Sequence, residues 1–345
     1  MARLNRQGLA TVSFPRRNLC RQGDDRQTGI ALVIVLLIVA LVSIIATDLT
    51  GQLQRETRRS ANLFDKQQAR YYVLGAEKLA IATLQADIKD SPDRDDLGQA
   101  WATQGLYFPI EGGDLTGAIS DKNNCFNLNS LVTSEADKGY TADAESVAFH
   151  AYQRLLLLLG LPDSLVYSLV DWLDTDSYVG LAGAEDLEYE LLSPAYRAAN
   201  NLINDISELR LIKGYDNEVV SRLRPYVCAL PEAGELKLNL NTLDQQQPEL
   251  LAMLIDSLTV TAAAAVLAER GQSGYDDLAS FWQLDALAGI EIDGQVKSVL
   301  QLDSDYYMLQ ATARVGRGHE ALRTLFKQVD KEKIHIIERR FGTIQ

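Results

Sequence analysis

The sequence is poor in the residues that carry most metal and nucleophilic chemistry. Among 345 residues there are three histidines and three cysteines, which leaves little room for a zinc or iron–sulfur site. His150, His319 and His335 are scattered along the chain. Neither a G-x-S-x-G nucleophile turn nor a phosphate-binding P-loop occurs. We therefore do not expect an enzyme.

Positive charge is also scarce. The chain carries 33 Lys and Arg against 47 Asp and Glu, a formal net charge of −14. Because phosphate recognition needs a basic surface, this balance counts against a nucleic-acid-binding protein. Hydrophobic residues make up 47% and charged residues 23%, a globular composition rather than a disordered one. The length predicts two domains, or one domain with a large insertion.

The charge distribution is uneven at the N-terminus. Residues 1–29 contain six Arg and two Asp, and the run Ile30–Ala46 that follows has no charge. As a helix, this run would span roughly 25 Å, slightly less than a bilayer core of about 30 Å. Basic residues before an apolar helix favour a cytoplasmic N-terminus and export of everything downstream.

Three interpretations of this segment compete. It is long for the apolar core of a secretory signal, and no clear A-x-A cleavage site follows it. An ordinary N-terminal membrane anchor fits its hydropathy. A basic leader that ends in Gly29, directly before the apolar run, also fits a prepilin signal, which is cleaved in front of that run.

The remainder predicts an α+β protein. Residues 51–90 have the apolar spacing of a half-buried helix, which Pro92 and Gly98 end. Short strands and turns are expected at 112–131, a helix at 144–161, and several short helices up to about 228. A strand at 236–242 and helices at 247–256 and 260–269 follow, and alternating patterns predict three strands after 302. This order suggests a helical domain inserted into a small sheet body.

Two cysteines remain once a leader containing Cys20 is removed. Cys125 and Cys228 lie about a hundred residues apart. In an oxidising periplasm, an even pair is typical of one disulfide, whereas two buried free thiols are the alternative.

Carboxylates are densest in residues 170–190, which contain no cation. The acidic residues there are Asp171, Asp174, Asp176, Glu185, Asp186, Glu188 and Glu190. Like charges at this density require solvent or a hard cation, and Ca²⁺ takes six to eight oxygen ligands. The spacing from Asp174 partly follows an EF-hand loop, but Val179 stands where that loop needs Gly. Asp205 and Glu208 could complete one or two sites. A solvated acidic loop is the alternative.

Residues 239–270 resemble a helix-hairpin-helix, a motif that often grips DNA phosphate. The turn at 256–260 lacks Gly, and the segment 239–285 holds one basic residue, Arg270, among seven acidic ones. Because phosphate would be repelled, we expect a packing unit and no nucleic-acid binding.

Taken together, these segments resemble the K-type minor pseudopilins of type II secretion systems, the general secretion pathway protein K family. The resemblance rests on the Gly29 junction, VDWLDTD, GAED, SELRLIKG, RPYVCALP and LNLNT, in the order of the family. It implies a pilin-like fold with a long N-terminal transmembrane helix, a small antiparallel sheet and a large inserted α-helical domain. It also implies structural Ca²⁺ in the acidic region and, as in several members, a disulfide.

The resemblance further implies how the chain is processed and where it acts. Prepilin peptidase would cleave between Gly29 and Ile30 and N-methylate Ile30. The mature protein would cross the bacterial inner membrane once, with its body in the periplasm. It would act at the pseudopilus tip with the I- and J-type minor pseudopilins, above the major pseudopilin and the inner-membrane assembly platform, in secretion of folded exoproteins. A type IV pilus minor pilin and an anchored DNA-uptake protein are alternatives.

Residue assignments follow from these expectations. The expected regions are a leader (1–29), a transmembrane helix (30–50), the first part of the body (51–131), the inserted helical domain (132–235), a strand with the hairpin-like segment (236–285) and the C-terminal strands (286–345). The candidate calcium ligands are Asp171, Asp174, Asp176, Glu185, Asp186, Asp205 and Glu208. A 29-residue leader is long for this signal class, and no second Met lies within it, so translation could start at a non-Met codon downstream.

Overall fold

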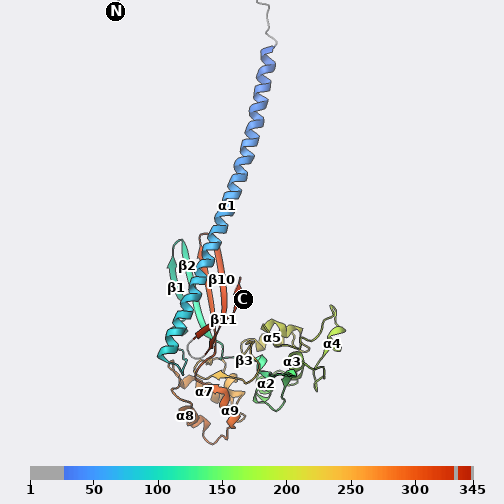
Figure 1. The fold of residues 1–345 in the computed structure, drawn as a ribbon, viewed down its shortest axis with the longest axis vertical. Helices are drawn as coiled ribbons and strands as arrows, with labels where there is room; N and C mark the ends of the chain where they lie inside the picture. The colour runs from blue at the N-terminus through green and yellow to red at the C-terminus, as the bar shows by residue number, and fades with distance from the viewer. Residues whose placement is uncertain (1–26, 330–332, 343–345) are drawn as a thin grey trace, which may run out of the picture. The chain divides into compact units, whose positions relative to one another are not determined.

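The computed structural model describes residues 27–329 and 333–342 (Figure 1). Contacts divide the chain into two compact units, 1–61 and 62–345. In the first unit the described residues belong to a single helix, α1 (Gln27–Asp90), which continues into the second unit. The prediction of one long N-terminal helix that ends before Pro92 is confirmed.

The second half of α1 packs on a sheet. Its buried positions Ala69, Val73, Ala80, Leu84 and Ile88 recur at helical spacing and join one hydrophobic cluster with the sheet. The sheet is antiparallel with the order β1-β2-β9-β10-β11. Its strands are β1 (Leu106–Ile110), β2 (Gly113–Asp121), β9 (Tyr306–Val315), β10 (Gly318–Val329) and β11 (Lys333–Phe341).

A close approach between α1 and the β9–β10 turn depends on glycine. Gly316 has a φ of +52°, and a Cβ on Gly318 would lie 2.5 Å from the backbone of Asp65. Arg317 also donates its backbone N–H to the Asp65 carboxylate at 3.1 Å. Glycine therefore lets the turn reach the helix backbone.

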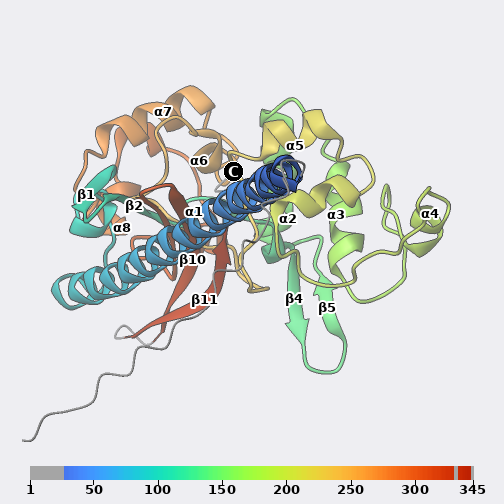
Figure 2. The same ribbon diagram turned by 90° about the horizontal axis from the view of Figure 1, so that it is seen from above.

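The chain between β2 and β9 forms the inserted helical region. Its first part begins and ends with β3 (Phe126–Asn127) and β6 (Val227–Cys228), which pair in parallel. Between them lie η2 (Leu128–Leu131), β4 (Val132–Glu135), β5 (Gly139–Ala142), α2 (Val147–Leu158), α3 (Leu165–Leu173), α4 (Asp186–Glu190), η3 (Ile206–Leu211) and α5 (Asn217–Leu223). In Figure 2 the hairpin β4–β5 extends beside α3.

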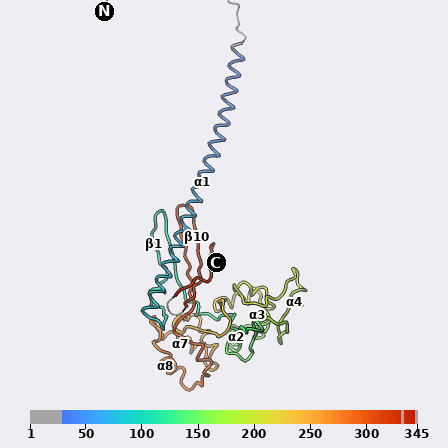
Figure 3. The backbone as a smooth tube through the Cα atoms, viewed as in Figure 1, coloured from blue at the N-terminus to red at the C-terminus, as the bar shows by residue number. Residues whose placement is uncertain are grey.

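The second part of the region follows the first directly. Its elements are β7 (Leu238–Asn239), α6 (Glu249–Ala252), α7 (Val260–Glu269), α8 (Leu278–Trp282), η4 (Asp285–Leu287), α9 (Gly294–Val299) and β8 (Leu300–Gln301). The tube in Figure 3 follows this path through α7 and α8. Both parts share one hydrophobic core that runs from Phe126 to Leu302.

Several expected bounds change. The strand expected at 236–242 is reduced to the two residues of β7, because the backbone N–H of Asn239 donates to the Asn123 carbonyl and that of Asn241 to the Asn239 side chain, not to a neighbouring strand. The helix expected at 247–256 ends at Ala252. Strand β1 and the β4–β5 hairpin were not expected, and the short η1 (Ala100–Ala102) precedes β1. Because the helical core includes Leu302, the region extends beyond the predicted limits of 132–235.

The hairpin-like segment packs inward, as expected. Helices α6 and α7 contribute Leu250, Leu251, Val266 and Leu267 to the shared core. Arg270 is buried, and its Nη1 donates to the carbonyl oxygen of Leu240 at 2.5 Å. The one basic residue of the segment is therefore engaged inside the fold.

A buried polar network joins the sheet to the inserted region. The Asp121 carboxylate accepts hydrogen bonds from the hydroxyls of Thr242 and Ser304, and Asp95 accepts from the Ser304 backbone N–H at 2.8 Å. Burial raises the pKa of Asp95 to about 8 and also raises that of Asp121. Burial thus disfavours the ionised form of both carboxyl groups inside the fold.

Candidate functional site

The acidic loop connects α3 to α4 and brings three of the predicted ligands together. Asp174 follows the last residue of α3, and Glu185 directly precedes α4. Carboxylate oxygens of Asp174, Asp176 and Glu185 all lie within 4.8 Å of one another. Both ends of the loop therefore meet at one group of oxygens.

Two of these carboxylates are buried without a donor. Asp174 is 7% and Glu185 4% exposed. Among the described residues, Oδ1 of Asp174 and both carboxylate oxygens of Glu185 have no hydrogen-bond partner. Buried polar atoms without partners are rare in folded proteins, because each costs its full desolvation penalty. The arrangement is suited to a ligand that supplies positive charge.

The electrostatics of the group point the same way. Burial, reinforced by Asp176, raises the pKa of Asp174 to about 7. Burial, reinforced by Asp171 and Asp174, raises the pKa of Glu185 to about 7. Holding these carboxylates close together in a buried place raises the free energy of their ionised form. A hard cation coordinated by their oxygens would remove that cost.

Asp171 organises the loop rather than joining the three-residue group. The backbone N–H of Gly180 donates to Oδ1 and Oδ2 of Asp171 at 3.2 and 3.0 Å. A Cβ on Gly183 would lie 1.8 Å from Oδ2 of Asp171. Only glycine fits that close approach. Burial raises the pKa of the Asp171 carboxyl, while the backbone amides of Gly180 and Ala184 oppose the shift.

Sequence reasoning missed Asn200. Its backbone has a φ of +46°, a conformation that Asn tolerates better than most residues. Its Nδ2 donates to the backbone carbonyl of Asp176 at 3.3 Å, and its Oδ1 is buried with no partner among the described residues. An amide oxygen is a common calcium ligand. The Asn-Asn pair at 200–201 was the available signal, but it is distant in sequence from the acidic run.

The other predicted ligands have different roles. Asp186 accepts from the backbone N–H of Ala198 at 3.1 Å. Asp205 caps η3 and forms ion pairs with Arg340 and with Arg323, the latter at 3.5 Å. Oε1 of Glu208 accepts from the backbone N–H of Asp205 at 3.1 Å. The structure does not support Asp205 and Glu208 completing the site, since helix capping and arginine pairing engage their carboxylates.

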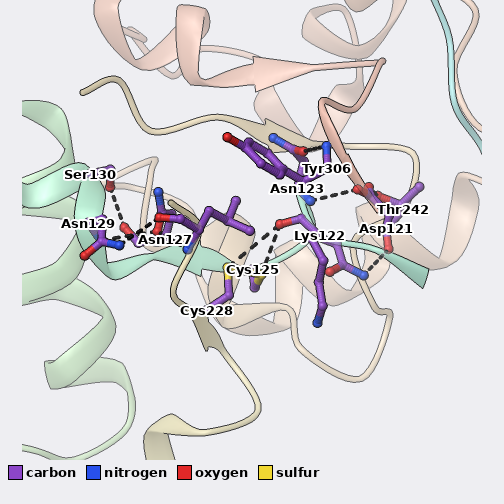
Figure 4. Close-up of a disulfide and its surroundings, with 12 residues drawn as sticks. Asp121, Lys122, Asn123, Cys125, Asn127, Asn129, Ser130, Cys228, Thr242 and Tyr306 are labelled. Atoms are coloured by element: carbon purple, nitrogen blue, oxygen red, sulfur yellow. Dashed lines mark hydrogen bonds between the residues drawn. A yellow bond between two sulfur atoms is a disulfide. The ribbon is translucent and has the colours of Figure 1, made fainter. Parts of the chain in front are cut away.

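The disulfide lies at the base of the first helical part (Figure 4). Cys125 and Cys228 are bonded, with their Cα atoms 5.8 Å apart. Cys125 follows β2 closely, and Cys228 ends β6. The bond therefore joins the beginning and the end of this part. Both cysteines pack with Leu230, Tyr306, Met308 and Leu325.

The N-terminal helix carries the expected membrane segment. Helix α1 contains an 18-residue segment with a mean hydropathy of 3.3, none of which is buried. The helix is long and apolar enough to cross a membrane. The predicted processing residues, Gly29 and Ile30, lie within its first turn, and Ile30 is 65% exposed. A single apolar helix of this length is suited to a single-pass membrane anchor.

Comparison with known proteins gives a consistent result. Two family models of type II secretion system protein K match residues 124–232 and 238–303, and a model of the PilX N-terminal region matches 28–76. Type II secretion system protein K of Aeromonas hydrophila is 36% identical over 92% of this chain and 98% of its own length. That of Pectobacterium carotovorum is 34% identical over 92% of this chain and 97% of its own.

A solved structure extends the likeness to the fold. A chain in the crystal structure of the GspK-GspI-GspJ complex from the type 2 secretion system of enterotoxigenic Escherichia coli superposes with a TM-score of 0.73 at 29% identity. The match covers 83% of this chain and 100% of that one. By sequence and fold, the chain belongs to the protein K family of type II secretion systems, the K-type minor pseudopilins.

Proposed function

We propose that this minor pseudopilin acts at the tip of the pseudopilus, where it joins the I- and J-type minor pseudopilins, initiates assembly and supports secretion of folded exoproteins. The observation that carries the proposal is the match to the whole of the protein K chain in a complex with those two partners. The size of the inserted region, Phe126 to Leu302, supports a tip position. Such a region would obstruct stacking of another subunit above it.

The apolar segment supports the same position. Most pilins carry Glu at the fifth mature position, which here is Ile34 if the mature chain begins at Ile30. That Glu is thought to pair with the terminal amine of the preceding subunit. An unpaired carboxylate in a bilayer costs several kcal/mol. A subunit with no predecessor gains nothing from the carboxylate, so an apolar residue suits it.

Processing and placement follow from the same proposal. Prepilin peptidase cleaves between Gly29 and Ile30 and methylates the new terminus. The basic residues of the leader keep it on the cytoplasmic side of the inner membrane, and the body is periplasmic. A periplasmic location suits the disulfide between Cys125 and Cys228. The major pseudopilin and the inner-membrane assembly platform are the further partners.

The acidic loop holds a structural calcium ion in this proposal. Asp174, Asp176 and Glu185 supply carboxylate oxygens, and Asn200 an amide oxygen, the hard donors that Ca²⁺ prefers. When bound, the ion neutralises the buried carboxylates. The chain itself positions the ligands: Asp171 orders the loop through Gly180, and Lys213 Nζ donates to the Gly183 carbonyl at 2.9 Å.

Partner co-purification tests the tip assignment. The full chain, expressed with tagged I- and J-type minor pseudopilins, is expected to be recovered with both in one complex. A type IV pilus minor pilin set serves as the control bait. Recovery with the control set and not with the I and J partners would contradict the assignment.

Mass spectrometry tests the processing step separately. Intact mass and N-terminal sequencing of membrane-extracted protein should give a chain that begins at methylated Ile30 only when prepilin peptidase is present. The Gly29→Ala variant should stay uncut. A chain cut beyond Ala46 would show an ordinary signal sequence instead.

A further inference from the structure

A cavity of about 430 Å³ lies in the second unit, between the first helical part and the sheet. η3 and α5 form one wall, and β10 and β11 form the other. Five cationic side chains line it: Lys122, Arg210, Arg224, Arg323 and Arg340. Two carboxylates, those of Asp205 and Glu338, accompany them. A chain with a net charge of −14 thus gathers an excess of positive charge in one cavity.

The two carboxylates are already engaged. Arg340 pairs with both Asp205 and Glu338, and Arg323 lies 3.5 Å from Asp205. Three cations remain. Arg210 and Arg224 are both exposed. Within residues 27–329 and 333–342, no carboxylate lies within ion-pair distance of Lys122, Arg210 or Arg224.

Lys122 is the cation most affected by the excess of positive charge in the cavity. Burial, together with the nearby Arg323, lowers the pKa of its ammonium, and Asp121 opposes the shift. Figure 4 shows its side chain extending away from the disulfide. Cys228, Leu230, Met308 and Leu325 provide an apolar lining beside the cations. Like charges gathered beside apolar walls repel strongly, and an anion between them removes that cost.

We propose that this cavity binds a multivalent oxyanion, phosphate or polycarboxylate, through Lys122, Arg210 and Arg224. Guanidinium groups match the oxygens of both ligand types in pairs, and charge-assisted hydrogen bonds to them are the strong ones. The volume lies within the range of about 300–1,000 Å³ found for small-molecule sites. The cavity is larger than a single phosphate requires, so it has room for the rest of a molecule that bears the phosphate or carboxylate group.

Isothermal titration calorimetry of the full chain in neutral detergent tests the proposal, with chloride holding the ionic strength constant. Three probes distinguish the source of the anion: inorganic phosphate, citrate and dihexanoyl phosphatidic acid. Saturable binding of at least one probe is expected. Arg210→Gln and Arg224→Gln should each weaken it about tenfold, because each removes one charge-assisted contact. The tightest probe identifies the source as free phosphate, polycarboxylate or lipid headgroup.

Arg222→Gln is the matched control. Arg222 lies in α5, two residues before Arg224, and pairs with Glu218 at 2.7 Å outside the cavity; the substitution removes the same charge. Its binding should equal that of the parent protein. Circular dichroism verifies that each variant is folded, which is expected because the three arginines are exposed. The proposal is overturned if no probe binds saturably, or if Arg222→Gln weakens binding as much as the cavity variants do.

Discussion

Two buried carboxylates, one in the sheet body and one in the helical region, differ in their hydrogen-bond partners. Glu77, on α1 beneath the sheet, is 3% exposed and receives hydrogen bonds from Thr324 at 2.8 Å and from Arg339 at 2.7 and 2.6 Å. Glu185, in the acidic loop, is 4% exposed and has no donor among the described residues. The sheet body therefore contains its own counter-charge for Glu77, whereas the helical region, under the proposed function, would take one for Glu185 from solution.

This difference implies two sources of stability. The sheet body should keep its stability whatever the divalent cation concentration, because Arg339 is part of the chain. The helical region should respond to calcium, because its ligands Asp174 and Glu185 are incompletely satisfied without it. Four perturbations separate the two regions.

Loss of the disulfide should affect both regions most. Cys125→Ala with Cys228→Ala opens a loop with a sequence separation of 103 residues. The free energy of unfolding should fall by about 3–5 kcal/mol, through the added freedom of the unfolded chain. Urea unfolding measures the change. Reductant should shift the parent protein to the same midpoint and leave the variant unchanged, and a reductant-insensitive parent would argue against the bond.

Breaking the ion pair between the buried Glu77 and the exposed Arg339 should be the next largest effect. Arg339→Met leaves Glu77 buried without its cation, at a cost of about 3 kcal/mol. The loss, measured by urea unfolding, should be the same with calcium and with chelator. Glu77→Met combined with Arg339→Met should recover most of the stability, because no charge then remains buried. A calcium-dependent loss would undermine the division between the regions.

Removal of the candidate ligands should show the opposite dependence. Asp174→Ala with Asp176→Ala should lower the melting temperature only when calcium is present. Calcium at 100 times its Kd should stabilise the parent protein by about 2.7 kcal/mol and the variant hardly at all. Glu291→Ala, which removes an exposed carboxylate elsewhere, should melt as the parent does. Equal melting of the parent with and without chelator would refute the calcium site.

The smallest effect concerns pH. Burial raises the pKa of Asp95 from near 4 to about 8, so the folded chain holds a proton that the unfolded chain releases above about pH 4. The stability linked to that proton is complete below the unfolded pKa and is lost as the pH rises toward 8. Asp95→Asn stays neutral throughout. Its unfolding free energy should fall less than that of the parent between pH 6.5 and 8, by on the order of 1–2 kcal/mol.

Urea midpoints across that pH range measure the difference. Asp90→Asn, which changes an exposed carboxylate at the end of α1, should follow the parent profile. Parallel profiles for the parent protein and Asp95→Asn would show that Asp95 titrates normally in the folded chain.

Elements with strong local patterns could be predicted from sequence. The end of α1 follows from Pro92, and strands β9, β10 and β11 follow from alternation over nine or more residues each. Strand β1 could not be predicted, because it is an edge strand with exposed apolar side chains and a proline, Pro109. The two-residue strands β7 and β8 exist only because distant segments pair in parallel.

The same distinction applies to the candidate site. Asp174, Asp176 and Glu185 are close in sequence, so their charge density alone indicated a site. Asn200 reaches the backbone carbonyl of Asp176 from a position with positive φ, which no local pattern encodes. The pairing of Asp205 could not be predicted, because its partners, Arg323 and Arg340, lie on strands more than a hundred residues away. Tertiary pairing, not local composition, decides which carboxylates remain available.

The position of the disulfide has a mechanical consequence. The first helical part begins and ends at two neighbouring points beside the sheet body, and Cys125 and Cys228 fasten those points together. A force that pulls on this part is then borne by the disulfide, and it does not separate the short β3–β6 pair from one end. The residues enclosed by the disulfide cannot be drawn out as an extended chain. Under load, the part should move as one attached piece until the core that it shares with the second part gives way.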